Sequence, residues 1–188
     1  MSEVLYRTYS SELELRKTGD GRTLYGIAVP YKKAMRISDD LVEQFGPDPF
    51  PAQVRAYNRI PFARDHLPLG GVLIGATKLL RNDAAGLYGE WRVARTPAGD
   101  EALALYEVGA LRDLSIGFEE QINRKLPGGI TERVRGRLFE VALVPEGAFG
   151  ELATALGVRS AQGTPVEVPT TPNLEAARAL FATLPPLA

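Results

Sequence analysis

The sequence of 188 residues contains no cysteine. Without thiols the chain can form no disulfide bond, no thiolate nucleophile and no cysteine-ligated metal centre. The absence of cysteine also suits a reducing compartment such as the cytoplasm. Function classes that depend on cysteine chemistry are therefore excluded.

Histidine is nearly as scarce, because the chain contains only His66. A zinc site built from several histidines is therefore impossible. A reaction that needs a proton acceptor near neutral pH must use His66, or a carboxylate or lysine with a shifted pKa. A magnesium or calcium site made of carboxylates alone stays open, but no acidic cluster has a known metal-loop spacing. We predict no metal and no cofactor.

Long apolar runs and a dominant charge are also absent. No segment approaches the roughly 18–20 apolar residues of a membrane-spanning helix. The first residues, MSEVLYRTYSSELEL, lack a basic stretch followed by an apolar one, so we expect no secretory signal. A formal net charge of −1 gives no bulk attraction to nucleic acid or to a membrane surface. We expect neither as a partner.

The patterns that are present predict a β-rich fold. The length and a hydrophobic fraction of 45% allow one domain with a sizeable core. Alternation between turn-rich stretches predicts strands over residues 4–16, 24–31, 70–80, 86–95, 111–120 and 130–144. Six strands with few helices predict a mainly β fold of the α+β class, arranged as a barrel or sandwich.

Two helices are expected in the segments between these strands. Residues 97–110 have the clearest helical pattern, with Thr96 as N-cap and Pro97 in the first turn. A shorter helix is expected around residues 39–45, capped by Ser38.

The composition changes near residue 160. We expect residues 1–160 to form the folded domain. Residues 161–188 are rich in proline and threonine and predict a flexible tail. Its last part, residues 174–184, is an amphipathic helix too short to be stable alone.

A candidate nucleophile lies in the strand LRDLSIGFEE, residues 111–120. Alternation turns Leu114, Ile116 and Phe118 to one face and Asp113, Ser115 and Gly117 to the other. The apolar face would anchor the strand, while Gly117 would leave room beside Ser115 for a substrate backbone. A merely solvated serine is the alternative. The G-x-S-x-G motif is absent, which argues against an α/β-hydrolase.

Glu140 stands alone in the otherwise apolar run RLFEVALV. Such a run predicts a strand buried on both faces, where an ionised carboxylate needs a partner. The structural alternative is an arginine of the segment RVRGR, which places Arg133, Arg135 and Arg137 on one strand face. The functional alternative is His66, whose tautomer a buried carboxylate would fix.

His66 follows Asp65 in the segment RDHLP, at an expected strand end. Adjacent side chains on a strand point to opposite faces, so Asp65 is badly placed to orient His66. Asp113 is the second acid that could do so, because it shares a face with Ser115. A structural or exposed histidine is the alternative interpretation.

Several segments occur in the order and spacing of a known family. They are GIAVPY, a single histidine followed by LG-type strands, D-x-x-G-L at residues 83–87, V-G-x-L-x-x-x-S-x-G-F at residues 108–118, and L-x-E-V-x-L-V at residues 138–144. Over roughly residues 5–160, the chain resembles the HK97-type prohead maturation proteases of tailed bacteriophages.

The resemblance implies an assemblin-like antiparallel β-barrel surrounded by helices. It implies a serine endopeptidase that cleaves scaffold protein, or the scaffolding segment of the major capsid protein, inside the prohead in the host cytoplasm, and that also cleaves itself. Ser115 would be the nucleophile, His66 the general base and Glu140 the third member. A homo-oligomer is also implied. The alternative is a non-catalytic head-assembly module that binds capsid or scaffold protein.

The resemblance also implies that the loop after the last strand contributes to the oxyanion site. Gly147 and Ala148 stand there, where family members often have Pro-Ala. This departure leaves the donor unnamed.

Overall fold

The computed structural model describes residues 3–9, 13–16 and 20–145. These residues form a ten-stranded sheet with a main path β1-β9-β10-β6-β7-β8-β3-β2, while β4 and β5 branch from β10. The strands are β1 (Leu5–Tyr9), β2 (Glu14–Arg16), β3 (Thr23–Pro30), β4 (Met35–Ser38), β5 (Leu41–Phe45), β6 (Pro61–Arg64), β7 (Val72–Asn82), β8 (Gly86–Val93), β9 (Asp113–Lys125) and β10 (Thr131–Val144).

Few helices accompany the sheet. The α-helices are α1 (Pro51–Arg55) and α2 (Pro97–Glu107), and the 3₁₀ turns are η1 (Tyr57–Arg59), η2 (Leu67–Leu69) and η3 (Pro127–Gly129). The mainly β fold expected from the sequence is therefore confirmed. Within the described part of the chain, no helix has the length and apolar character needed to cross a membrane.

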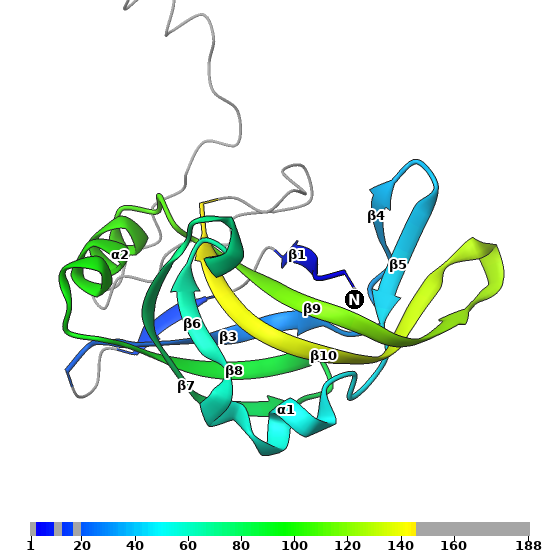
Figure 1. Ribbon diagram of the computed structural model, residues 1–188, viewed down its shortest axis with the longest axis horizontal. Helices are drawn as coiled ribbons and strands as arrows, with labels where there is room; N and C mark the ends of the chain where they lie inside the picture. Colours follow the sequence, from blue (N-terminus) through cyan, green and yellow to red (C-terminus); the bar gives the residue numbers. More distant parts are fainter. Residues whose placement is uncertain (1–2, 10–12, 17–19, 146–188) are drawn as a thin grey trace, which may run out of the picture. The chain divides into compact units, whose positions relative to one another are not determined.

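Strands β9 and β10 form the long curved hairpin that crosses Figure 1. Leu114, Ile116 and Phe118 are fully buried on one face of β9, as its alternation predicts. Register shifts along the pair, one of them between Leu138 and Glu140, bend the hairpin. Strand β1 pairs with β9, whereas β5 and β6 pair in parallel with β10. The hairpin is thus the centre on which the other strands of this region assemble.

The helix over residues 97–110 is confirmed as α2, with its end at Glu107. The backbone N–H of Gly99 donates to Thr96 Oγ1 at 3.2 Å, which is the predicted N-cap bond. Pro97 occupies the first turn, where its missing N–H costs nothing.

The short helix expected around residues 39–45 is wrong. Asp39 and Asp40 form the turn of the β4–β5 hairpin, and Ser38 ends β4 instead of capping a helix. Glu43 and Phe45 are buried on one face of β5, which pairs in parallel with β10. The partner strand comes from about 90 residues further along the chain, so the local pattern could not show it.

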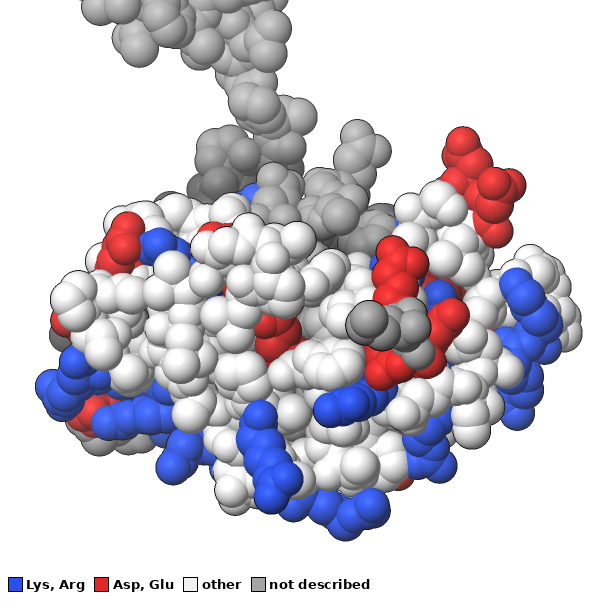
Figure 2. All heavy atoms as spheres, in the orientation of Figure 1, with Lys and Arg blue, Asp and Glu red and all other residues white. Residues whose placement is uncertain are grey.

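Packed aromatic rings fill the core. Phe62 stacks on Trp91 with their ring centroids 5.6 Å apart, and Phe45 lies against Phe118 at 5.2 Å. Figure 2 shows Lys and Arg side chains gathered along the lower side of this view, toward the side that carries α1. The predicted tail, residues 161–188, lies outside the described residues, and so does its terminal helix.

Candidate active site

The register of β9 against β10 places Ser115 and Glu140 on one face of the hairpin. Ser115 is paired with Ala142, and Gly117 is paired with Glu140. Both residues are enclosed, because the exposed fraction of the whole residue is 0% for Ser115 and 3% for Glu140. Two neighbouring strands therefore hold a hydroxyl and a carboxylate in fixed positions.

His66 comes from the tight turn between β6 and β7. Strand β6 ends at Arg64, Asp65 has a left-handed φ of 57°, and His66 is the N-cap residue of η2. The backbone N–H groups of Leu69 and Gly71 donate to the His66 carbonyl oxygen at 2.8 and 2.9 Å. A Cβ on Gly71 would lie 2.4 Å from the backbone carbonyl oxygen of Asp65, so the turn requires glycine.

This turn changes one premise of the sequence interpretation. His66 does not lie on the strand that ends at Arg64, so strand alternation does not decide where Asp65 points. The conclusion that another acid contacts His66 nevertheless agrees with the geometry, because the ring nitrogen Nδ1 meets Glu140.

The imidazole of His66 bridges the other two predicted residues. His66 Nδ1 lies 2.6 Å from Glu140 Oε1, and His66 Nε2 lies 2.7 Å from Ser115 Oγ. The second oxygen of Glu140 accepts a bond from the Leu67 N–H at 3.2 Å. An ionised carboxylate only accepts hydrogen bonds, so Nδ1 carries the imidazole proton and Nε2 accepts from the serine hydroxyl.

Glu140 thus meets His66, and Arg133 and Arg137 of RVRGR have other contacts. Arg133 is buried and bonds Glu43 Oε2 at 2.8 and 2.6 Å. Arg137 lies over the Phe139 ring at 4.8 Å. Register shifts break the expected alternation of the three arginines, so they do not share one solvated face.

Asp113, the other acid considered, is buried at the start of β9, where it is paired with Val144. The two sequence alternatives for the partner of His66 are therefore separated by geometry, since the carboxylate within hydrogen-bond distance of Nδ1 is that of Glu140.

Strand β1 adds two residues that the sequence interpretation missed. Thr8 Oγ1 lies 2.9 Å from Ser115 Oγ, and the Tyr6 ring lies 4.2 Å from the His66 ring at an angle of 48°. Burial, and secondly the charge of Glu140, raise the pKa of the Tyr6 phenol above its usual value. The segment LYRTY carries no local signal of this role, because only the pairing with β9 reveals it.

Gly117 has a different role from the one expected. A Cβ at this position would lie 3.0 Å from Glu140 Cγ and 3.3 Å from Tyr6 Cε1. The missing side chain therefore makes room for the carboxylate of Glu140 and the ring of Tyr6. The expectation that it makes room for a substrate backbone is replaced by this close packing.

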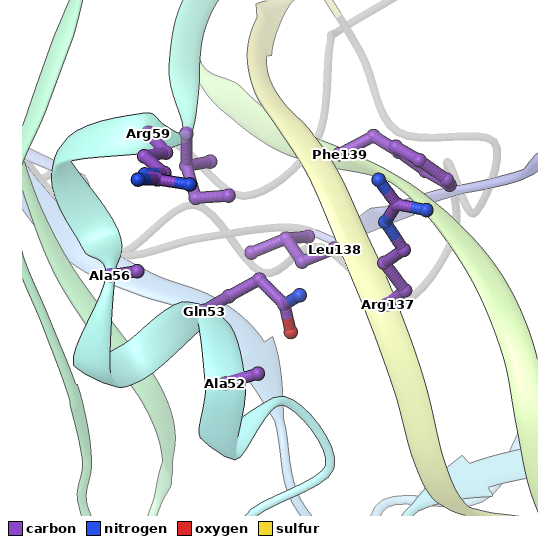
Figure 3. Close-up of a pocket in the computed structure, with 8 residues that line it drawn as sticks. Ala52, Gln53, Ala56, Arg59, Arg137, Leu138 and Phe139 are labelled. Atoms are coloured by element: carbon purple, nitrogen blue, oxygen red, sulfur yellow. The ribbon is translucent and has the colours of Figure 1, made fainter.

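A pocket of about 270 Å³ lies away from these residues, between α1, η1 and β10 (Figure 3). It is lined by Ala52, Gln53, Ala56, Arg59, Ile60, Arg137, Leu138 and Phe139. None of the three predicted catalytic residues lines it. Among residues 3–9, 13–16 and 20–145, no group of three or more His, Asp or Glu side chains is placed to hold a metal ion.

A serine hydroxyl bonded to an imidazole, whose other nitrogen is held by a buried carboxylate, is the arrangement found in serine hydrolases. In this mainly β fold, the three side chains have the geometry of that class of protein. The model of the caudovirus prohead serine protease family matches residues 11–165, and the chain belongs to this family. The resemblance seen in the sequence is therefore confirmed.

A solved structure has a similar fold. It is the capsid assembly protease gp21 of bacteriophage T4, with a TM-score of 0.56 and 12% sequence identity. The similarity covers 76% of this chain and 97% of that chain. At this identity the likeness concerns the fold alone. No curated protein matches the sequence.

Proposed function

We propose that the chain is a serine endopeptidase that cleaves scaffold protein, or the scaffolding segment of the major capsid protein, within the prohead during capsid maturation. The observation that carries this proposal is the position of His66, 2.7 Å from Ser115 Oγ and 2.6 Å from Glu140 Oε1. Membership of the prohead serine protease family supports the reaction class and the setting.

The proposed reaction has two stages. His66 Nε2 takes the proton of Ser115 as Oγ attacks a peptide carbonyl carbon, and Glu140 stabilises the resulting imidazolium. His66 then gives this proton to the leaving amine, and an acyl-enzyme ester remains on Ser115. Water attacks the ester with His66 as base, the proton returns to Ser115 Oγ, and the carboxylic acid product leaves.

Several finer features belong to the same proposal. The chain would adopt the assemblin-like barrel, work as a homo-oligomer in the host cytoplasm, and cut itself within the tail over residues 160–173. The loop with Gly147 and Ala148, expected to contribute to the oxyanion site, lies outside the described residues. Mass spectrometry of the active protein tests the self-cleavage, and an intact C-terminus would contradict it.

Co-expression with the phage's capsid and scaffold proteins tests the proposal. The wild-type chain should shorten one of them, whereas Ser115→Ala and His66→Ala should fold and leave both intact. Ser38→Ala is the matched control, because Ser38 lies exposed at the end of β4. Cleavage in the presence of Ser115→Ala at the wild-type rate would refute the serine mechanism. It would indicate that another protease in the cells makes the cut and would favour a non-catalytic assembly module.

A further inference from the structure

We propose that strand β1 completes the active site, with Thr8 orienting the nucleophilic Ser115 and Tyr6 positioning His66. This inference rests on the proposed function and extends it to two residues outside the Ser–His–Glu set. The family match begins at residue 11, so β1 (Leu5–Tyr9) lies outside the part of the chain that it covers.

The pairing of β1 with β9 puts both residues at the site. Thr8 is paired with Ser115, and Tyr6 is paired with Gly117. Directly opposed residues of an antiparallel pair lie on the same face of the sheet. Thr8 and Tyr6 therefore share the face that carries Ser115 and Glu140, while Arg7, paired with Ile116, belongs to the other face.

Hydrogen-bond accounting gives Thr8 a defined chemical role. The proton on His66 Nδ1 is donated to Glu140, so Nε2 must accept the proton of the Ser115 hydroxyl. The remaining bond at Ser115 Oγ, 2.9 Å long, must then be donated by the Thr8 hydroxyl. This donor holds the oxygen so that the serine proton points at Nε2 and at no other acceptor.

The hydrogen bond from Thr8 to Ser115 Oγ also assists the reaction as negative charge develops on that oxygen. When the Ser115 proton passes to His66, the Thr8 hydroxyl still donates to Oγ and stabilises the charge there until the bond to the carbonyl carbon forms. When the acyl-enzyme breaks down, Oγ leaves the carbon and recovers its proton from His66. Thr8 again donates to the departing oxygen.

Tyr6 acts on the other end of the site. Its ring packs at a tilt against the imidazole of His66, and its Cε1 would lie 3.3 Å from a Cβ added to Gly117. The side chains of His66 and Glu140 are only 11% and 4% exposed. The ring thus helps to fix the imidazole plane and to exclude water from the bond between His66 and Glu140.

An ion-pair cluster on the opposite face holds β1 in place. The Arg7 guanidinium bonds Glu43 of β5 and also donates to the Tyr6 carbonyl oxygen at 2.7 Å. The same Glu43 carboxylate bonds Arg133 of β10 at 2.6 Å, and Glu43 is only 2% exposed. An edge strand anchored in this way can carry side chains whose positions matter to within about 1 Å.

The test measures how fast a fluorophosphonate, a small serine-directed probe, labels the full-length protein. Thr8→Val removes the hydroxyl at nearly constant volume and should slow labelling roughly ten- to hundred-fold. Thr8→Ser keeps the hydroxyl and should restore most of the lost rate. A small probe makes little use of extended substrate contacts, so the rate reports on the nucleophile itself.

Thr77→Val is the matched control. Thr77 is also buried, but its hydroxyl donates to the Ile60 carbonyl oxygen at 2.7 Å, far in the sequence from Ser115. The Thr77→Val substitution should lower the melting temperature without slowing the labelling of the folded protein. Wild-type labelling of Thr8→Val would overturn the role of Thr8.

Tyr6 supplies a second, independent arm should Thr8→Val fold poorly. Tyr6→Leu should slow labelling and change its pH profile, and Tyr6→Phe, which keeps the ring, should lose much less. Equal rates for wild type and Tyr6→Leu would refute the role of Tyr6. Failure of the proposed function has a different signature, namely no labelling of Ser115 in the wild-type protein.

Discussion

Glu140 contacts an imidazole although three arginines precede it in its own strand. Its two oxygens accept from His66 Nδ1 and from the Leu67 N–H, so both ends of the carboxylate are occupied by the turn that carries the histidine. The sequence shows that an isolated acid in an apolar run needs a partner. Which partner it finds depends on β6 and β10 lying side by side in parallel, and a single sequence does not reveal that pairing.

The first prediction concerns this carboxylate. Glu140→Gln should lower the catalytic rate by roughly 10³–10⁴-fold, because an amide that donates to Nδ1 selects the imidazole tautomer that cannot accept the serine proton. Steady-state cleavage of a scaffold-derived peptide measures the effect. Asp113→Asn is the comparison and should cost much less activity. The reverse order of the two losses would make Asp113 the orienting acid.

A second prediction concerns the glycine beside this carboxylate. The methyl group of Gly117→Ala would lie 3.0 Å from Glu140 Cγ and 3.1 Å from Glu140 Oε1, so the Glu140 side chain that contacts His66 would have to shift. We expect a loss of activity of roughly ten- to hundred-fold, since small displacements at an active site are costly.

Gly46→Ala is the matched control for that substitution, because its new Cβ would meet Glu132 Cδ at an ordinary 3.4 Å. It should leave activity unchanged. Circular dichroism and thermal melting of both variants separate a local effect on the site from a loss of folding. Wild-type activity in a folded Gly117→Ala protein would mean that Glu140 accommodates the methyl group without losing its function, which would contradict the prediction.

At the scale of helices and strands, some elements can be predicted from neighbouring residues, whereas others depend on residues far along the chain. Helix α2 was predictable because Thr96 and Pro97 mark its start within a few residues. Strand β9 was predictable because its apolar face alternates over several residues. The local pattern over β5 favours a helix, whereas the strand forms because β10 supplies its pairing and the charge partner of Glu43.

Strand β1 shows the same limit for function. The pattern over residues 4–16 predicts one edge strand, but the structure has two, β1 and β2, at opposite ends of the main path of the sheet. The edge position is confirmed, whereas the single strand is wrong, because β1 pairs with β9 and β2 with β3. Nothing in LYRTY indicates that Thr8 faces a nucleophile, because the face of an edge strand is decided by its register against β9. His66 and Glu140 were accessible to sequence reasoning because each is unusual in its own segment, and the family resemblance joined Ser115 to them. A threonine in a strand is not unusual, and nothing in the sequence linked Thr8 to the three.

At the scale of the whole described structure, the cluster around Glu43 joins β1, β5 and β10. Glu43→Gln keeps the side-chain volume but leaves Arg7 and Arg133 without the charge that both contact. Breaking a buried ion pair on one side typically lowers the free energy of unfolding by about 3–5 kcal/mol. Urea unfolding should show a loss of that order, together with weaker fluorophosphonate labelling because β1 is loosened.

Asp83→Asn is the control for that prediction. Asp83 pairs with Arg81 at 2.9 Å, and these side chains are 36% and 54% exposed. Solvent screens such a pair, so its loss should change the unfolding midpoint far less. Equal effects of the two substitutions would show that the Glu43 cluster contributes no more than a surface pair.

The central claim is that Ser115 is the nucleophile that His66 activates. Full-length protein labelled with a fluorophosphonate and analysed by peptide mass spectrometry tests it most directly. The account predicts a single adduct on Ser115, absent from Ser115→Ala and strongly slowed in His66→Ala. A preparation that cleaves scaffold or capsid protein but carries no adduct, or carries it on another residue, would contradict the account.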